Sequence, residues 1–266
     1  MRYKMLATDF DLTLSRQDQS VSERNQRAIR EAEEAGLRVV LASGRLPAAA
    51  RTIFPYFSPD TPAVLCNGGI LYLPRTDEIL WENTLPEEEA LALMDWFSRR
   101  TDGVCIVWCR DRIYASALNE LSQQYCQRRR LPVHPLSSPK ALAKAGVSKV
   151  LYYAPTEEMQ SAAAAFAAHP PVQVSYFPSG PDILELVSFG VNKGAGLLRC
   201  AEYLGISPTE IAAVGDSGND VDMLRTAAFP VAVDNAVPEV KALAQRIVPS
   251  CEDDGVAVLL AELLRE

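Results

Sequence analysis

Short apolar runs alternate with helical patterns at both ends of the chain. The first apolar run covers residues 3–8 and is followed by Asp9, and a second covers residues 37–42 and is followed by Ser43. Residues 20–35 lie between them and follow a helical pattern that a serine can cap and a glycine can end. Continuous apolar strands that alternate with helices predict a parallel sheet covered on both faces.

A third apolar run, residues 63–66, precedes Asn67-Gly68-Gly69 and fits a further strand of this sheet. The same alternation returns near the C-terminus, where a helical pattern over about residues 193–204 precedes the apolar run 211–214. The polar sequence GDSGND follows at residues 215–220. Both ends of the chain are therefore expected to build one sheet.

The middle of the chain has a different pattern, with paired strands and grouped helices. Residues 104–108 and 112–116 are two strand-like runs separated by a short polar segment, which is typical of a hairpin. The sequence thus predicts an α/β protein with a doubly wound, Rossmann-like parallel-sheet core. About residues 1–82 and 189–266 form this core, and an inserted α+β domain covers about residues 83–188.

Composition and charge exclude several classes of protein. The chain has 266 residues, of which 48% are hydrophobic and 23% are charged, so it can bury a large core and is not a disordered chain. A formal net charge of −8 argues against binding to nucleic acid or to an acidic membrane surface, because both are negatively charged. No apolar run approaches the roughly 20 residues that span a bilayer. We expect a cytoplasmic protein, and the sequence leaves the oligomeric state open.

The cysteines show no spacing typical of a metal site. Their order contains no CxxC pair, and the two histidines, His134 and His169, stand beside prolines away from them. Buried, reduced thiols are the simplest interpretation, and a catalytic Cys–His pair is the less favoured one. The six cysteines are Cys66, Cys105, Cys109, Cys126, Cys200 and Cys251.

Polar side chains gather where the predicted core strands end. Ligands of open parallel sheets bind beyond the carboxyl ends of the strands. Asp9 and Asp11 are two residues apart, which in an extended backbone places both side chains on one side. If Asp216 joins them, three acids share a small volume, and their mutual repulsion favours a bound cation. Mg²⁺ is the natural choice because it prefers oxygen ligands.

Donors near the same strand ends suit a phosphate group. Lys193 offers a positive charge, Ser43 a hydroxyl and Gly44 an accessible backbone amide, while Asn219 offers an amide at the start of a helix. Acids around Mg²⁺ together with such donors indicate phosphoryl transfer, in which positioning and charge stabilisation dominate catalysis. Taken singly, each of these residues would more simply be a turn, cap or surface residue.

Four ordered motifs carry a resemblance to a known family. DFDLTL at residues 9–14, SGR at 43–45, Lys193 and GDSGND at 215–220 resemble the motifs of the haloacid dehalogenase superfamily. The insertion between the second and third motifs resembles the type IIB cap of the Cof-like sugar phosphatases. This sequence has Leu12 where those proteins usually carry glycine, and Asn192 where an acid is common.

The resemblance implies a role for each acid. Asp9 would attack phosphorus and form an aspartyl-phosphate, and Asp11 would act as general acid and base. Mg²⁺ would be held by the Asp9 carboxylate, the Asp11 backbone carbonyl and Asp216. Asp220 would support the metal or orient Lys193. The phosphoryl oxygens would be bound by Ser43, Lys193, Asn219 and the backbone amides of Phe10 and Gly44.

The sequence therefore predicts a magnesium-dependent phosphatase that acts on small phosphorylated metabolites, with sugar phosphates as the first choice. One alternative is a phosphomutase or phosphotransferase with the same aspartyl-phosphate chemistry. The other is a non-enzymatic sensor of phosphorylated ligands on the same fold. The role of Arg45 stays open between a substrate contact and a structural ion pair.

Overall fold

The computed structural model describes residues 2–129 and 131–265. These residues divide into two compact units, each of which is described by itself. The first unit consists of the chain up to residue 45, residues 50–82 and the chain from residue 192 onward; the second consists of residues 46–49 and 83–191.

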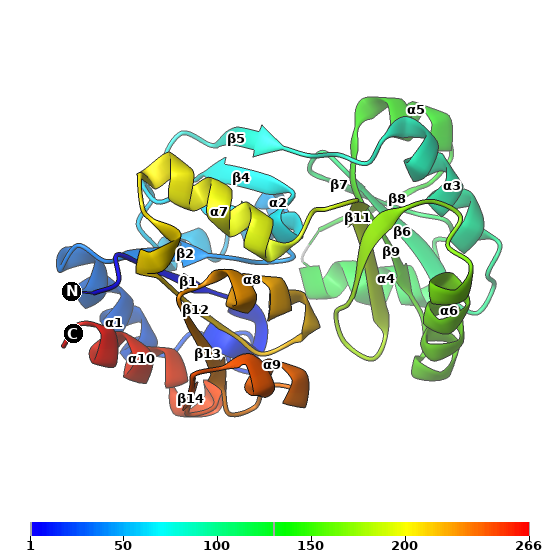
Figure 1. Ribbon diagram of the computed structural model, residues 1–266. Helices are drawn as coiled ribbons and strands as arrows, with labels where there is room; N and C mark the ends of the chain where they lie inside the picture. Colours follow the sequence, from blue (N-terminus) through cyan, green and yellow to red (C-terminus); the bar gives the residue numbers. More distant parts are fainter. Residues whose placement is uncertain (1, 130, 266) are drawn as a thin grey trace. The chain divides into compact units, whose positions relative to one another are not determined.

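The first unit is built on a five-stranded parallel sheet in the order β14-β13-β12-β1-β2 (Figure 1). Three of its strands are buried over their whole length or nearly so, as their continuous apolar sequences predict. The strands are β1 (Met5–Thr8), β2 (Arg38–Leu41), β12 (Ile211–Gly215), β13 (Phe229–Val233) and β14 (Arg246–Val248).

The order of these strands places helices on both faces of the sheet. The chain moves from β1 to β2 in one direction and from β12 through β13 to β14 in the other. Because such connections are right-handed, the helices of the two halves lie on opposite faces. Accordingly α1 (Glu23–Glu34) packs with α10 (Gly255–Leu263), while α7 (Lys193–Leu204) and α9 (Pro238–Leu243) pack with α8 (Val221–Thr226). The predicted doubly wound α/β core is confirmed.

Residues 63–65 form the expected strand, which runs parallel to β2 at an isolated bridge between Ala42 and Val64 but also belongs to a separate antiparallel sheet. β3 (Ala63–Leu65) pairs antiparallel with β4 (Ile70–Leu73), which pairs with β5 (Glu78–Glu82). This small sheet touches the parallel one through an isolated bridge between Ala42 and Val64. The tight turn after β3 reverses the chain, and a reversed chain pairs antiparallel with the strand that it has just left.

The second unit is a mixed sheet with helices. Six strands lie in the order β10-β11-β9-β6-β7-β8, and all pairs except β7 with β8 are antiparallel. The predicted hairpin is present as β6 and β7. The strands are β6 (Val104–Cys109), β7 (Arg112–Ala115), β8 (Val133–Pro135), β9 (Val147–Tyr153), β10 (Val174–Pro178) and β11 (Ile183–Ser188). The helices are α3 (Glu87–Ser98), α4 (Glu120–Arg129), α5 (Pro139–Ala145) and α6 (Thr156–Ala168). The residues of the short α2 (Pro47–Ala50) are divided between the two units.

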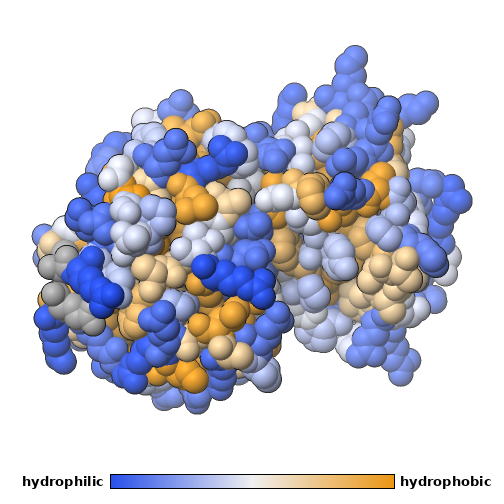
Figure 2. All heavy atoms as spheres, in the orientation of Figure 1, coloured by the Kyte–Doolittle hydropathy of each residue, from blue (hydrophilic) through white to orange (hydrophobic). Residues whose placement is uncertain are grey.

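Apolar and polar residues are distributed between the interior and the surface as in ordinary folded proteins. All six cysteines are buried thiols outside any disulfide, as predicted. On the face drawn in Figure 2, hydrophilic residues are interspersed with smaller apolar areas, as on ordinary protein surfaces. Within the described ranges, none of the helices has the length and apolar character that a bilayer crossing requires.

Helix α7 approaches the turn after β3 through two glycines. A Cβ atom added to Gly196 would lie 2.6 Å from the Cα of Gly68 and 2.6 Å from the side chain of Val64. The helix therefore packs at a distance that only a residue without a side chain permits.

Gly196→Ala is expected to lower the free energy of unfolding by about 1–3 kcal/mol because the added methyl group overpacks this contact. Urea denaturation measures the change. The matched control is Gly218→Ala, where nothing lies within 4 Å of the added Cβ and the change should stay below about 0.5 kcal/mol. Equal stability of wild type and Gly196→Ala would contradict the close packing.

Candidate active site

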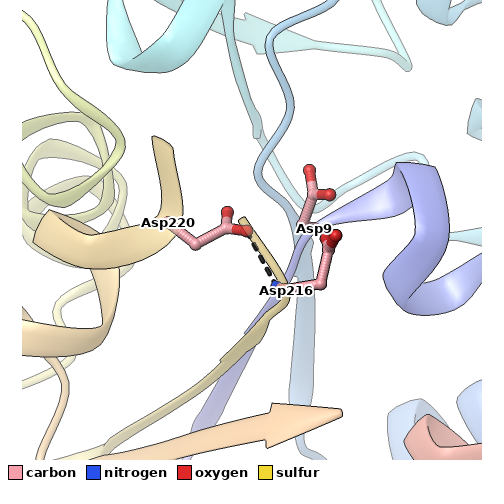
Figure 3. Close-up of side chains that lie close together, drawn as sticks. All are labelled: Asp9, Asp216 and Asp220. Carbon is pink, nitrogen blue, oxygen red and sulfur yellow. Dashed lines mark hydrogen bonds between the residues drawn. The ribbon is translucent and has the colours of Figure 1, made fainter. Parts of the chain in front are cut away.

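The carboxyl ends of β1 and β12 lie next to each other because these two strands pair in parallel at the centre of the sheet. The chain order reverses between them, which is where open α/β sheets bind ligands. Asp9 follows β1 and Asp216 follows β12, and the backbone N–H of Asp9 donates to the carbonyl of Val214 at 3.1 Å. Figure 3 shows the two carboxylates side by side, with Asp220 reaching toward them from the turn after β12.

Lys193 joins this group from the first turn of α7. Its Nζ donates to Oδ1 of Asp9 at 2.7 Å and to Oδ1 of Asp220 at 2.6 Å. The lysine side chain has no exposed surface, so these two carboxylates replace the water that its charge would otherwise bind. The structure thus brings Lys193 and Asp9 together across 184 positions of sequence.

Asp220 holds both the lysine and the loop that precedes it. Its Oδ2 accepts the backbone N–H groups of Asp216 and Ser217 at 3.0 and 3.1 Å. A Cβ on Gly215 would lie 2.5 Å from the Asp220 carboxyl carbon, so glycine is required there. Because both oxygens of Asp220 bond to protein donors, its main effect is to orient Lys193 and the Asp216 backbone.

Asp216 has a partner that the sequence analysis missed. The hydroxyl of Thr13 donates to its Oδ1 at 2.8 Å, and both residues are buried. Thr13 belongs to the same DFDLTL segment as Asp9, so the two strand ends are tied together by side chains as well as by the sheet. The only sequence signal for this contact was the hydroxyl of Thr13, four residues after the predicted site residue Asp9.

Burial and mutual repulsion shift the pKa values of these acids. Burial raises the pKa of Asp9 well above its ordinary value, and the negative charges of Asp220 and Asp216 add to the effect, although Lys193 opposes it. For Asp216, burial and the Asp220 carboxylate raise the pKa to about 7. Burial alone would lower the pKa of Lys193, but Asp220 and Asp9 outweigh it and raise that pKa.

The acid cluster fits a hard divalent cation. Asp9, Asp216 and Asp220 each offer a carboxylate oxygen, and these oxygens lie within 4.8 Å of one another. Burial first, and then the neighbouring carboxylates, raises the pKa values of Asp9 and Asp216, and a bound cation would favour the ionised form of both. Oxygen donors with excess negative charge are the set that Mg²⁺ prefers.

The Asp11 side chain is held by Arg45. After Asp9 the chain makes an irregular turn over Phe10–Leu14, in which Asp11 has a φ of −69° and a ψ of 120° and Leu12 has a φ of 60°. Asp11 pairs with Arg45 through two hydrogen bonds of 3.0 and 2.5 Å. Arg45 also stacks over the Phe10 ring, so the structure places Arg45 in an ion pair. Burial is the largest cause of the raised pKa values of Asp9 and Asp216, and the negative charge of Asp11 adds to both, so Asp11 lies within electrostatic range of the cluster.

The remaining predicted residues surround the same strand ends. Ser43 is buried after β2, and its hydroxyl accepts the backbone N–H of Arg45 at 3.2 Å across Gly44. Asn219 is almost fully buried, and its Nδ2 donates to Oδ1 of Asn67 at 3.1 Å. The sequence pattern placed Asn67 only at the end of a predicted strand, with no connection to the site.

Comparisons with known proteins assign the family. Residues 6–260 match the model of the haloacid dehalogenase-like hydrolases. The chain belongs to this family. The predicted resemblance is therefore confirmed, and Asp9, Lys193 and Asp216 lie at the strand and helix ends where its motifs were expected.

Relatives of this haloacid dehalogenase-like hydrolase include phosphatases. A phosphoglycolate phosphatase of Methanopyrus kandleri is 29% identical, over 98% of this chain and 97% of the relative. A chloroplast protein of Arabidopsis thaliana named as the endoribonuclease YBEY is also 29% identical, over 96% of this chain, but the match spans only 46% of that longer protein. Phosphatase relatives of matching length support the prediction of a phosphoric monoester hydrolase.

Solved structures share the fold over nearly the whole chain. A haloacid dehalogenase-like hydrolase from Bacteroides thetaiotaomicron has a TM-score of 0.85 and 25% identity, over 98% of this chain and 99% of the other. A sugar phosphatase of subclass IIB has a TM-score of 0.83 and 22% identity, over 98% of each chain, and this likeness concerns the fold.

Leu12→Gly is expected to raise the free energy of unfolding by up to about 1 kcal/mol, because glycine adopts the left-handed backbone of this position without strain. Leu198 is a matched control, since it is also 42% exposed but lies within α7. Leu198→Gly should destabilise by about 1 kcal/mol. Urea denaturation compares the two, and a loss of stability in both variants would contradict strain at Leu12.

The raised pKa of Asp216 predicts a pH dependence of stability in EDTA. Between about pH 4 and pH 7 the folded state keeps a proton that the unfolded state has lost, so stability falls as pH rises through this range. Asp216→Asn keeps the side-chain shape and should flatten the fall and unfold at a higher temperature than wild type at pH 8.

Thermal unfolding from pH 4 to pH 8 measures this slope. Asp18→Asn is the control, because hydrogen bonds from Ser20 lower the pKa of Asp18 and keep its titration below this window. A wild-type curve that rises between pH 5 and pH 7 and does not respond to Asp216→Asn would refute the assignment.

Proposed function

We propose that this chain is a magnesium-dependent phosphatase that hydrolyses small phosphorylated metabolites through an aspartyl-phosphate. The observation that most directly supports this proposal is the position of the Asp9 carboxylate, which the buried Lys193 holds beside Asp216 at the centre of the sheet. A carboxylate fixed in this way is a positioned nucleophile for a phosphate whose charge Lys193 offsets. The phosphatase relatives support the same reaction class.

In the first step an Asp9 oxygen forms a bond to phosphorus while the ester P–O bond breaks, and Asp11 gives its proton to the departing oxygen. Water then attacks phosphorus and returns a proton to Asp11, which releases inorganic phosphate and restores Asp9. Lys193 bonds to one oxygen of Asp9 and thereby fixes the orientation of the carboxylate.

The residues that would hold Mg²⁺ are Asp9, Asp216 and the backbone carbonyl of Asp11. When bound, Mg²⁺ would supply positive charge to the carboxylates and the phosphoryl oxygens. Asp220 fixes this arrangement from outside by bonding to Lys193 and to the Asp216 backbone.

The phosphoryl oxygens would bind to a set of donors that surrounds the strand ends, and these donors stabilise negative charge without moving during the reaction. The proposed substrates are small phosphorylated metabolites, and sugar phosphates are the preferred class among them. The names of two similar proteins, a phosphoglycolate phosphatase and a sugar phosphatase, support this choice. The donors are Ser43, Lys193, Asn219 and the backbone amides of Phe10 and Gly44.

Asp9→Asn is expected to reduce magnesium-dependent hydrolysis of p-nitrophenyl phosphate by at least about 10³-fold, since the amide is a poor nucleophile. The Asn side chain still accepts a hydrogen bond from Lys193, so the fold should be retained. Phosphate release and thermal unfolding are measured together, with Asp18→Asn as an exposed control that should keep full activity.

Retained turnover in Asp9→Asn would refute the nucleophile. Phosphate release from a panel of phosphorylated metabolites, with and without a sugar acceptor, separates hydrolysis from phosphoryl transfer. Hydrolysis without an acceptor supports the phosphatase, whereas transfer that needs the acceptor would favour a phosphomutase or phosphotransferase. Binding without any turnover would favour a sensor.

A further inference from the structure

The turn between β3 and β4 has an unusual backbone. Cys66, Asn67 and Gly68 have successive φ values of 52°, 53° and 96°. Side chains other than glycine adopt this region with strain, so the surroundings must stabilise the turn. Cys66 and Asn67 are buried, and the stabilising contacts are therefore made by the protein.

The turn is bonded to the segment that carries Ser43. The backbone N–H of Asn67 donates to the Ser43 carbonyl at 3.2 Å, and the backbone N–H of Cys66 donates to the Arg45 carbonyl at 2.9 Å. The Ser43 N–H in turn donates to the carbonyl of Val64 at 2.8 Å. These three bonds fix the position of Ser43 relative to the turn.

The turn also supports the start of α7. A Cβ on Gly68 would overlap the backbone carbonyl of Asn192, the residue that caps this helix immediately before Lys193. One turn further along the helix, Gly196 lies against the Cα of Gly68. The helix end that carries Lys193 thus sits directly on the turn.

The side chain of Asn67 reaches the last of the polar segments. Its Oδ1 accepts a hydrogen bond from Nδ2 of Asn219 at 3.1 Å, while Oδ1 of Asn219 accepts from the Ser217 hydroxyl at 2.7 Å. Both polar atoms of the Asn219 amide are therefore held, and the amide cannot rotate without breaking one of these bonds.

We propose that Asn67 is a positioning residue, which orients the Asn219 amide toward the phosphoryl group without touching the substrate itself. This inference rests on the proposed function, in which Asn219 binds a phosphoryl oxygen. The position needs a residue that tolerates left-handed backbone and offers an oxygen acceptor, and asparagine does both. Aspartate would add a negative charge near a bound phosphate, which asparagine avoids.

A double-mutant cycle tests the coupling. Asn67→Gly keeps the backbone freedom of the turn and removes the amide. In the wild-type background it should lower kcat/KM for p-nitrophenyl phosphate by roughly tenfold or more and weaken inhibition by inorganic phosphate similarly, because Asn219 is no longer held. In an Asn219→Ala background the same change should have an effect of less than about twofold.

Several controls make the result decisive. Gln19→Gly replaces an exposed residue that also has a left-handed backbone, with a φ of 66°, and should leave kcat/KM unchanged. Asn67→Ser is a second substitution whose hydroxyl is too short to hold Asn219, and it should behave as Asn67→Gly does. Thermal unfolding establishes that each variant is folded.

Equal losses from Asn67→Gly with and without Asn219 would overturn the proposal, and so would a folded Asn67→Gly variant with wild-type kinetics. If wild type hydrolyses no phosphate ester, the proposed function itself fails. The coupling can then still be tested by calorimetric titration with inorganic phosphate in the presence of Mg²⁺. The proteins compared are wild type, Asn67→Gly, Asn219→Ala and the double mutant. Non-additive losses of phosphate affinity support the coupling, and additive losses or none overturn it.

Discussion

The ammonium group of Lys193 lies fully inside the protein between the carboxylates of Asp9 and Asp220, and the arrangement of the site depends on it. A buried charge is expensive unless it is paired and hydrogen-bonded, and loss of one partner leaves the others uncompensated. Asp9 follows β1, Asp220 follows β12 and Lys193 begins α7. The two ion pairs of Lys193 therefore connect three elements of the core. The nucleophile proposed here is thereby held by the same contacts that hold the fold.

Glycines make this close arrangement possible. Asp220 can fold back over the loop because Gly215 has no side chain, and α7 can approach the turn after β3 because Gly68 and Gly196 face each other. The positions of the charged groups therefore depend on places where a methyl group would not fit. Packing and electrostatics act on the same few residues, and neither alone would place Lys193 between its two carboxylates.

The sequence predicted those parts of the structure that follow from periodicity and strand ends. Asp9, Asp216 and Lys193 could be brought together because parallel strands finish at one edge of a sheet. The rest depends on backbone turns that periodicity does not encode. The left-handed Leu12 lies in the irregular turn that carries Asp11, whose carboxylate pairs with Arg45, and the turn at Asn67 reverses the chain into the antiparallel β4 and β5. Tertiary contacts stabilise both turns.

The position of β1 has a consequence for how the chain acquires its structure. β1 lies between β2 and β12, and its register pairs Met5 with Arg38 on one side and with Ile211 on the other. During synthesis β1 and β2 can meet early, whereas β12 leaves the ribosome only after the whole second unit has been made. Until then one edge of β1 and the acid that follows it lack their partners, so the nascent core exposes an unpaired strand that chaperones would need to protect.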